Sequence, residues 1–319
     1  MQQHADARGL ARSTDLRTLA LVAVGVLVAA YLLLVLTPLG QSWDDAALVG
    51  RLRATAADRR EVGQFLKGID AATILLLLIV VLVVGFVRRR ARLAFTAGGA
   101  WLAAVVSAEV LKALLPRPSY GGELAILASK EYDTYPSGHS TIATGFVLAL
   151  VMVANNRWRP LVALLGVLWA ASVTTGVVAA GWHRPSDAIG GIALATAWLS
   201  FASSRLAKGR GLATEPGRLA GRLPVVAIVL ASLGVLGALV AALTGRQDLL
   251  PADVPWWAFP LGQMAIDVAV VAAVGRFAWL LRDIRFGDPQ DVADPGAALP
   301  GEDLATAAGR EPEVDRPPA

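Results

Sequence analysis

Long runs of apolar residues dominate the chain and predict membrane-spanning helices. Crossing about 30 Å of hydrocarbon takes roughly 20 residues of helix. Eight segments approach or exceed this length, at 17–38, 71–87, 93–115, 139–155, 160–181, 186–204, 223–244 and 257–281. The pattern therefore predicts an all-α protein, a polytopic membrane helical bundle.

The polar connections between these segments predict their orientation. Basic residues gather in three connections, 88–92, 157–159 and 205–222, which the positive-inside rule places in the cytoplasm. Both termini are then cytoplasmic, and the connections 116–138 and 182–186 face outward. Residues 45–67 mix apolar and charged positions at helical spacing, which favours an amphipathic helix at the membrane interface.

The segments group into five parts. Residues 1–16 form a cytoplasmic N-terminal tail, 17–204 a six-helix membrane core, 205–222 a basic cytoplasmic loop, and 223–282 two further transmembrane helices. From residue 283 onward, nine acidic and three basic residues accompany many prolines and few apolar residues. This composition is typical of disorder, so 283–319 is predicted to be a disordered acidic cytoplasmic tail.

Composition narrows the functional classes. The chain is 55% hydrophobic and 17% charged, whereas a soluble domain carries about 25% charged residues. It has no cysteine, which excludes disulfides, thiolate metal sites and cysteine nucleophiles. The net charge of +4 does not predict a nucleic-acid partner, because most basic residues lie in short connections between apolar segments.

Two polar clusters on the predicted outer side favour the binding of an anion. Lys112 lies near the end of the third apolar segment, and Arg117 follows it between two prolines. Ser137, Gly138 and His139 precede the fourth segment at a predicted helix start. The unpaired N–H groups and the dipole of a helix N-terminus attract negative charge there.

A third cluster, His183-Arg184-Pro185-Ser186-Asp187, enters the sixth segment on the same side. An aspartate within reach of one imidazole nitrogen fixes the tautomer and leaves the other nitrogen free to attack. Each cluster alone is also explained by helix capping or by a lysine that reaches the membrane surface. Together they predict a phosphate site with a nucleophile and an acid.

These motifs resemble those of the type 2 phosphatidic acid phosphatase family, membrane lipid phosphatases related to the vanadium haloperoxidases. That family carries Lys-x6-Arg-Pro, Pro-Ser-Gly-His and Ser-Arg-x5-His-x3-Asp. Residues 136–139 match the second motif in full, and His183 with Asp187 match the end of the third. The resemblance covers about residues 17–204 and implies a six-helix phosphatase core, to which the last two helices are additions.

Two positions depart from the family pattern. Only four residues separate Lys112 from Arg117, where the family has six. Gly176 and Val177 stand where the third motif begins with serine and arginine. One expected phosphate-binding arginine is therefore missing, and we predict that Arg184 supplies its charge from another direction.

The resemblance implies a phosphatase that needs no metal and no cofactor, and the positive-inside rule places its site at the outer face of the plasma membrane. His183 would attack phosphorus and form a phosphohistidine, Asp187 would orient His183, and His139 would protonate the leaving oxygen and then activate water. The residues predicted to hold the phosphate are Lys112, Arg117, Ser137, Gly138 and Arg184.

The expected partners of the chain are a lipid phosphate and the membrane. A homo-oligomer is also possible from the sequence. The candidate substrates are a polyprenyl phosphate or diphosphate, phosphatidic acid and phosphatidylglycerol phosphate. A lipid phosphotransferase with the same histidines, and a non-catalytic lipid-phosphate binder, are the alternatives. Two carboxylates lie within apolar segments: Glu109, which shares a helix face with Lys112, and Asp267, one turn after Gln263.

Overall fold

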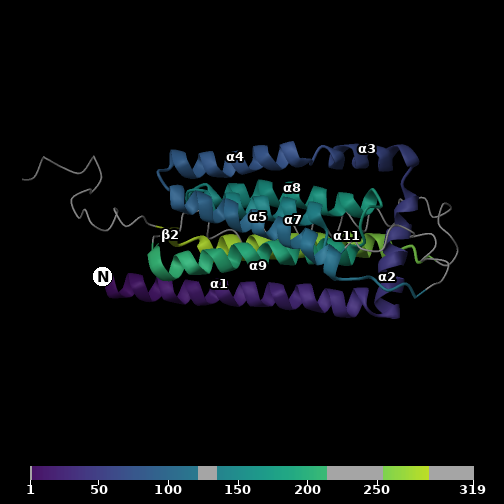
Figure 1. Ribbon diagram of the computed structural model, residues 1–319, viewed down its shortest axis with the longest axis horizontal. Helices are drawn as coiled ribbons and strands as arrows, with labels where there is room; N and C mark the ends of the chain where they lie inside the picture. The colour runs from purple at the N-terminus through teal and green to yellow at the C-terminus, as the bar shows by residue number, and fades with distance from the viewer. Residues whose placement is uncertain (1, 121–134, 214–253, 287–319) are drawn as a thin grey trace, which may run out of the picture. The chain divides into compact units, whose positions relative to one another are not determined.

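The computed structural model describes residues 2–120, 135–213 and 254–286, which are helical apart from one pair of short strands (Figure 1). This architecture confirms the predicted all-α class. The helices are α1 (Gln2–Ala30), α2 (Pro38–Val49), α3 (Ala56–Lys67), α4 (Ala71–Val87), α5 (Ala91–Leu114), α7 (Gly138–Val153), α8 (Arg159–Ala179), α9 (Pro185–Arg210) and α11 (Ala258–Leu281).

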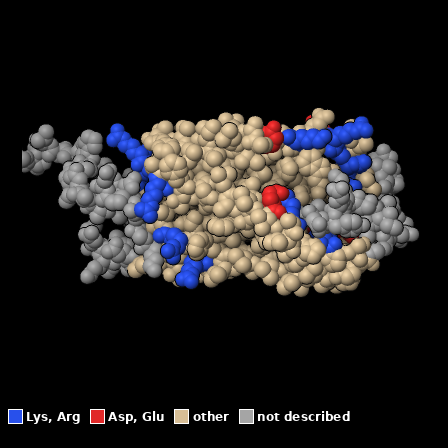
Figure 2. Space-filling view, in the orientation of Figure 1, with Lys and Arg blue, Asp and Glu red and all other residues tan. Residues whose placement is uncertain are grey.

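Several of these helices can cross a membrane. Among the described residues, four are long and apolar enough: Leu10–Val35, Ala91–Leu114, Arg159–Ala179 and Ala258–Leu281. On the face shown in Figure 2, a band of uncharged surface separates basic residues at one end of the helices from charged residues toward the other end. A multi-pass membrane protein is therefore confirmed. Helix α4 passes only together with α3, α7 is shorter, and α9 is not among these four, while the predicted segment 223–244 lies outside the described residues. The count of eight therefore stays a prediction.

Helix α7 lies at the centre of the bundle, in contact with α5, α8 and α9. It is a short apolar helix of 16 residues, most of them buried. Helix α1 runs along α9 (Figure 1). Trp101, Leu148, Met152, Leu199 and Phe277 are among the fully buried side chains of the core. This packing fixes the starts of α7 and α9, where the second and third motifs lie.

The segment 36–70 folds differently from the predicted single amphipathic helix over 45–67. It forms α2 and α3, separated by a 3₁₀ turn, Gly50–Arg53. Thr55 and Asp58 make a reciprocal capping box, which satisfies two backbone N–H groups and starts α3. Helix α3 then meets α4 at an angle of 56°.

Ordered structure extends further than predicted at both ends of the core. Helix α1 begins at Gln2 and continues into a π-helical turn, Tyr31–Val35. Strand β1 (Gly211–Ala213) follows α9 and pairs antiparallel with β2 (Ile284–Phe286). The backbone hydrogen bonds between β1 and β2 therefore fix residues that we predicted to belong to the loop 205–222 and the tail 283–319. Residues 214–253 and 287–319 lie outside the described part of the chain.

Candidate active site

The second and third motifs are joined at the starts of α7 and α9. Ser137 caps α7, and its hydroxyl accepts a hydrogen bond from the backbone N–H of Ser140 (3.3 Å). The backbone N–H of Ser137 donates to the carbonyl oxygen of Asp187 (2.9 Å). The two helix starts that the sequence predicts to form one anion site are therefore neighbours.

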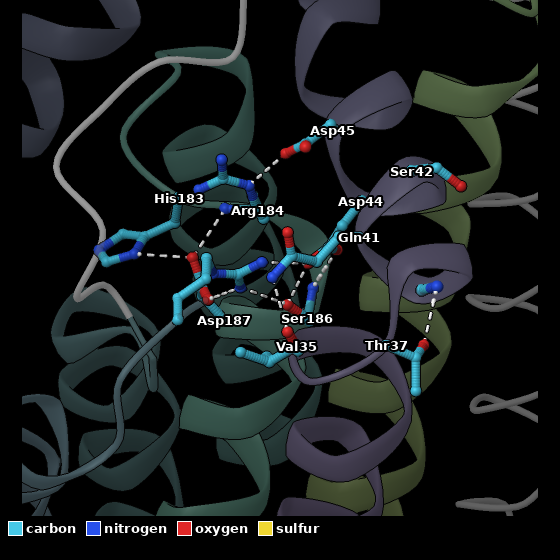
Figure 3. A network of polar contacts seen from close by, with 12 residues as sticks. Val35, Thr37, Gln41, Ser42, Asp44, Asp45, His183, Arg184, Ser186 and Asp187 are labelled. Atoms are coloured by element: carbon cyan, nitrogen blue, oxygen red, sulfur yellow. Dashed lines mark hydrogen bonds and ion pairs between the residues drawn. The ribbon is translucent and has the colours of Figure 1, made fainter. Parts of the chain in front are cut away.

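Asp187 lies in the first turn of α9, completely buried, and faces His183 (Figure 3). Its Oδ2 lies 3.5 Å from Nδ1 of His183 and accepts a hydrogen bond from the backbone N–H of Arg184 (3.0 Å). The His183 side chain is 12% exposed. This contact places the carboxylate beside Nδ1, as the His-x3-Asp spacing predicts, although within the described residues Nδ1 itself makes no hydrogen bond.

Arg117 lies on the other side of Asp187 and is almost enclosed, with its side chain 2% exposed. Its guanidinium donates to Asp187 (2.8 Å), to the hydroxyl of Ser186 (3.1 Å) and to Asp44 (3.3 Å). Burial alone would lower the pKa of Arg117, but Asp187 and Asp44 together raise it. In the observed arrangement Arg117 ties the first motif to the third: its Nη1 and Nη2 donate to the two carboxylates and to Ser186, whereas its buried Nε has no hydrogen-bond partner among the described residues.

Asp44 belongs to α2, outside all three motifs, and sequence reasoning missed it. It is completely buried, and it accepts hydrogen bonds from the backbone N–H of Ser186 (3.0 Å) and from the Ser186 hydroxyl. Burial raises the pKa of Asp44 to about 6, although Arg117 opposes the shift. Asp44 therefore fixes both Arg117 and the first turn of α9.

The neighbouring Asp45 engages the second arginine of the site. The Nε of Arg184 donates to Asp45 Oδ1 (2.6 Å), and Figure 3 shows this guanidinium directed toward Asp45 while the His183 imidazole faces Asp187. Both side chains are largely buried. Arg184 is thus the sequence neighbour of His183, but its Nε donates to the carboxylate of Asp45.

The polar face of α2 carried a signal in the sequence. Gln41, Asp44 and Asp45 recur with Leu48 at the spacing of one helix face, and all four are buried. Gln41 donates to the carbonyl oxygens of Val35 and Pro118 (both 2.7 Å). Polar residues on the face of a helix that would otherwise be apolar indicate partners inside the protein.

The other predicted residues lie at the start of α7. A Cβ added to Gly138 would lie 3.3 Å from Nζ of Lys112 and 3.0 Å from Oε1 of Glu109, so the end of α5 reaches this helix start. Lys112 donates to Glu109 (2.7 Å), which accounts for the carboxylate within that apolar segment. The ring of His139 lies 5.3 Å from that of Trp182, one residue before His183.

The structure therefore gathers every predicted site residue around the starts of α7 and α9. Lys112, Ser137, Gly138 and His139 lie at the start of α7, and Arg117, His183, Arg184 and Asp187 lie at the start of α9. Within the described ranges, no group of three or more His, Asp or Glu side chains is arranged to hold a metal ion. The arrangement provides an imidazole beside a buried carboxylate, a second imidazole and several cations.

A family model matches the part of the chain that contains these motifs. Residues 93–209 match the model of the PAP2 superfamily, which confirms the resemblance to the type 2 phosphatidic acid phosphatases over that segment and indicates a phosphatase. The segment contains all three motifs. Helices α1 to α4 and α11, with Asp44 and Asp45, lie outside it.

A solved structure is also similar: a transmembrane PAP2-type phosphatidylglycerolphosphate phosphatase from Bacillus subtilis. It shares 18% sequence identity, the match covers 61% of this chain and 94% of that one, and the TM-score is 0.45. A comparison with curated proteins finds no match. The family match supports a membrane lipid phosphatase.

Proposed function

We propose that the chain hydrolyses the phosphate ester of a lipid at the extracytoplasmic face of the membrane, through a phosphohistidine on His183. The contact between His183 Nδ1 and the buried carboxylate of Asp187 carries this proposal. An imidazole held at Nδ1 presents Nε2 as the nucleophile, and the carboxylate stabilises the positive charge that develops.

In the first step, Nε2 of His183 attacks phosphorus, an N–P bond forms, and the bond between phosphorus and the lipid oxygen breaks. His139 gives a proton to that oxygen, and the lipid alcohol leaves. In the second step His139 takes a proton from water, the water oxygen attacks phosphorus, and the N–P bond breaks to release inorganic phosphate. Such general acid–base help contributes about a hundred- to ten-thousand-fold.

The phosphate oxygens would be held by Lys112 and the start of α7, while Arg117 and Arg184 near His183 each donate to carboxylates. Phosphoryl transfer depends mainly on positioning and on charge stabilisation, and fixed donors in a partly dry site act strongly. The contact of Lys112 with Gly138 and the bond between Ser137 and Asp187 support a shared cup for one phosphate. The substrate candidates are a polyprenyl phosphate or diphosphate, phosphatidic acid and phosphatidylglycerol phosphate.

The test is a phosphate-release assay on purified protein in detergent with EDTA, using these lipid phosphates as a panel. We expect release from at least one lipid, and its loss in His183→Ala. The matched control is His4→Ala, the third histidine, which lies at the start of the chain. Activity that requires added magnesium, or that survives His183→Ala, would overturn the proposal.

A further inference from the structure

The arginines of the predicted phosphate site are already balanced by carboxylates. Arg117 pairs with Asp44 and Asp187, and Arg184 pairs with Asp45. At neutral pH these two cations therefore face three carboxylates. A phosphate anion approaching His183 would be repelled by this cluster unless a further cation took part, because the interaction between charges is strong in a buried site.

Arg51 is a cation that lies against the turn before His183, and it comes from outside the three motifs. It lies in the 3₁₀ turn Gly50–Arg53 between α2 and α3, and its Nη1 donates to the carbonyl oxygen of Leu48 (2.7 Å). Its guanidinium packs on Gly181, where a Cβ would overlap Nε. Gly181 has φ +75°, a backbone conformation that glycine adopts without strain.

This contact brings Arg51 to the turn that carries the nucleophile. Gly181 precedes His183 by two residues, and the backbone N–H groups of Trp182 and His183 both donate to the carbonyl oxygen of Val177 (2.8 and 3.2 Å). Val177 itself is fully buried and uncharged. The turn thus presents His183 on a fixed backbone, with Arg51 held against its first residue.

Arg51 has cations as its charged neighbours. Burial lowers the pKa of Arg51, and Arg59 and Arg184 lower it further. Among residues 2–120, 135–213 and 254–286, no carboxylate forms a salt bridge with Arg51. A half-buried guanidinium beside two others is an unfavourable arrangement that a bound anion relieves.

We propose that Arg51 binds a phosphate oxygen of the substrate at His183, an inference that rests on the proposed function. Arg117, held by its carboxylates, then acts as a positioning residue for Asp187. The cation that position 177 lacks is supplied by the segment between α2 and α3, outside the region that matches the family model.

The test compares Arg51→Gln with Arg60→Gln, an exposed arginine of α3 in the same segment. On the lipid phosphate that the wild-type protein hydrolyses best, we expect Arg51→Gln to raise KM about ten- to a hundredfold, the loss typical of a hydrogen bond to a charged group. Inhibition by inorganic phosphate should weaken by a similar factor. Arg60→Gln should stay within about twofold of wild type, since exposed substitutions have small effects.

The unfolding temperature in detergent separates a binding role from a structural one, and we expect no change in Arg51→Gln. If that variant does not fold, Arg51→Lys keeps the charge but not the planar fork, and it should still raise KM. Equal KM and equal phosphate inhibition in the Arg51→Gln and Arg60→Gln variants, with an active wild type, would overturn the inference alone. A wild-type protein that hydrolyses none of the lipids would overturn the proposed function, and the inference with it.

Discussion

Asp44 joins two of the sequence motifs without belonging to either. Its carboxylate receives the guanidinium of Arg117 and the N–H and hydroxyl groups of Ser186, and it is completely buried. Asp187, on the far side of Arg117, repels it. The ionisation of Asp44 is therefore coupled to the folding of this end of the bundle.

This coupling predicts a pH dependence of stability. Burial raises the pKa of Asp44 from 3.8 to about 6, so between these values the native state binds more protons than the unfolded state. The free energy of unfolding should then fall as pH rises from about 4 to 6, by at most about 3 kcal/mol. Asp44→Asn, which does not ionise, should remove this dependence. Unfolding temperatures in detergent across that pH range measure it, and parallel curves for the two proteins would contradict the prediction.

The sequence predicted the place of some site residues but not the partners of others. His183, His139 and Asp187 follow from local motifs, because a helix start and a four-residue spacing are encoded within a few positions. The partners of Arg117 and Arg184 do not, because Asp44 lies 73 positions from Arg117 and Asp45 lies 139 from Arg184. Only the buried polar face of α2 indicated that these carboxylates have partners.

At the scale of elements, glycine allows α9 to approach the start of α7. A Cβ at Gly191 would lie 2.5 Å from the carbonyl oxygen of Ser137 and 2.9 Å from Cβ of Ser140. The close approach permits the bond between the Ser137 N–H and the Asp187 carbonyl. The geometry of the site therefore depends on the packing of two helices as well as on its polar residues.

Gly191→Ala should separate these helices and lower kcat about tenfold or more, since a small displacement misplaces the reacting groups. Overpacking should also destabilise the protein by about 1–3 kcal/mol. Gly99→Ala on α5 is the matched control, because its Cβ would meet nothing within 4 Å, and alanine favours a helix by about 1 kcal/mol. Phosphate release and unfolding temperature measure both variants, and equal activities would show that the contact is not needed.

Arg159 holds the other end of the bundle together. It is 3% exposed, and its guanidinium donates to the carbonyl oxygens of Val151 (3.1 Å), Met152 (3.5 Å) and Ile284 (2.7 Å). These carbonyls lie at the end of α7 and in β2, and the guanidinium also donates to the carbonyl oxygen of Leu281 at the end of α11, so one side chain satisfies acceptors from three elements.

Arg159→Leu should lower the free energy of unfolding by about 2–4 kcal/mol, because buried carbonyls lose a charged donor. The exposed Arg157, two residues earlier, gives the control: Arg157→Leu should change it by less than about 0.5 kcal/mol. Thermal unfolding in detergent distinguishes them. A similar loss in both variants would mean that general charge near the membrane, and not the carbonyl contacts, stabilises this end.

For the whole molecule, the period and length of the apolar segments predicted the helical class, and α4, α5, α7, α8 and α11 lie close to the predicted ranges. The segment 36–70 was not predicted in this form. The break between α2 and α3 lies at the 3₁₀ turn Gly50–Arg53 and the Thr55–Asp58 capping box, and a tertiary bond from Gln41 to Pro118 holds α2 against the segment after α5. Helical periodicity does not encode such contacts, and they bring Asp44, Asp45 and Arg51 to the site.

The orientation in the membrane decides which lipids can reach His183, and the absence of cysteine makes it directly measurable. The positive-inside rule places 88–92 in the cytoplasm and the site outside. Ala57 on α3 and Arg92 at the start of α5 are both exposed. With a membrane-impermeant maleimide, Ala57→Cys should be labelled in right-side-out membrane vesicles, and Arg92→Cys only after permeabilisation. The reverse pattern would place the site in the cytoplasm and the substrate in the inner leaflet. The distribution of basic residues would then not determine the orientation of the chain.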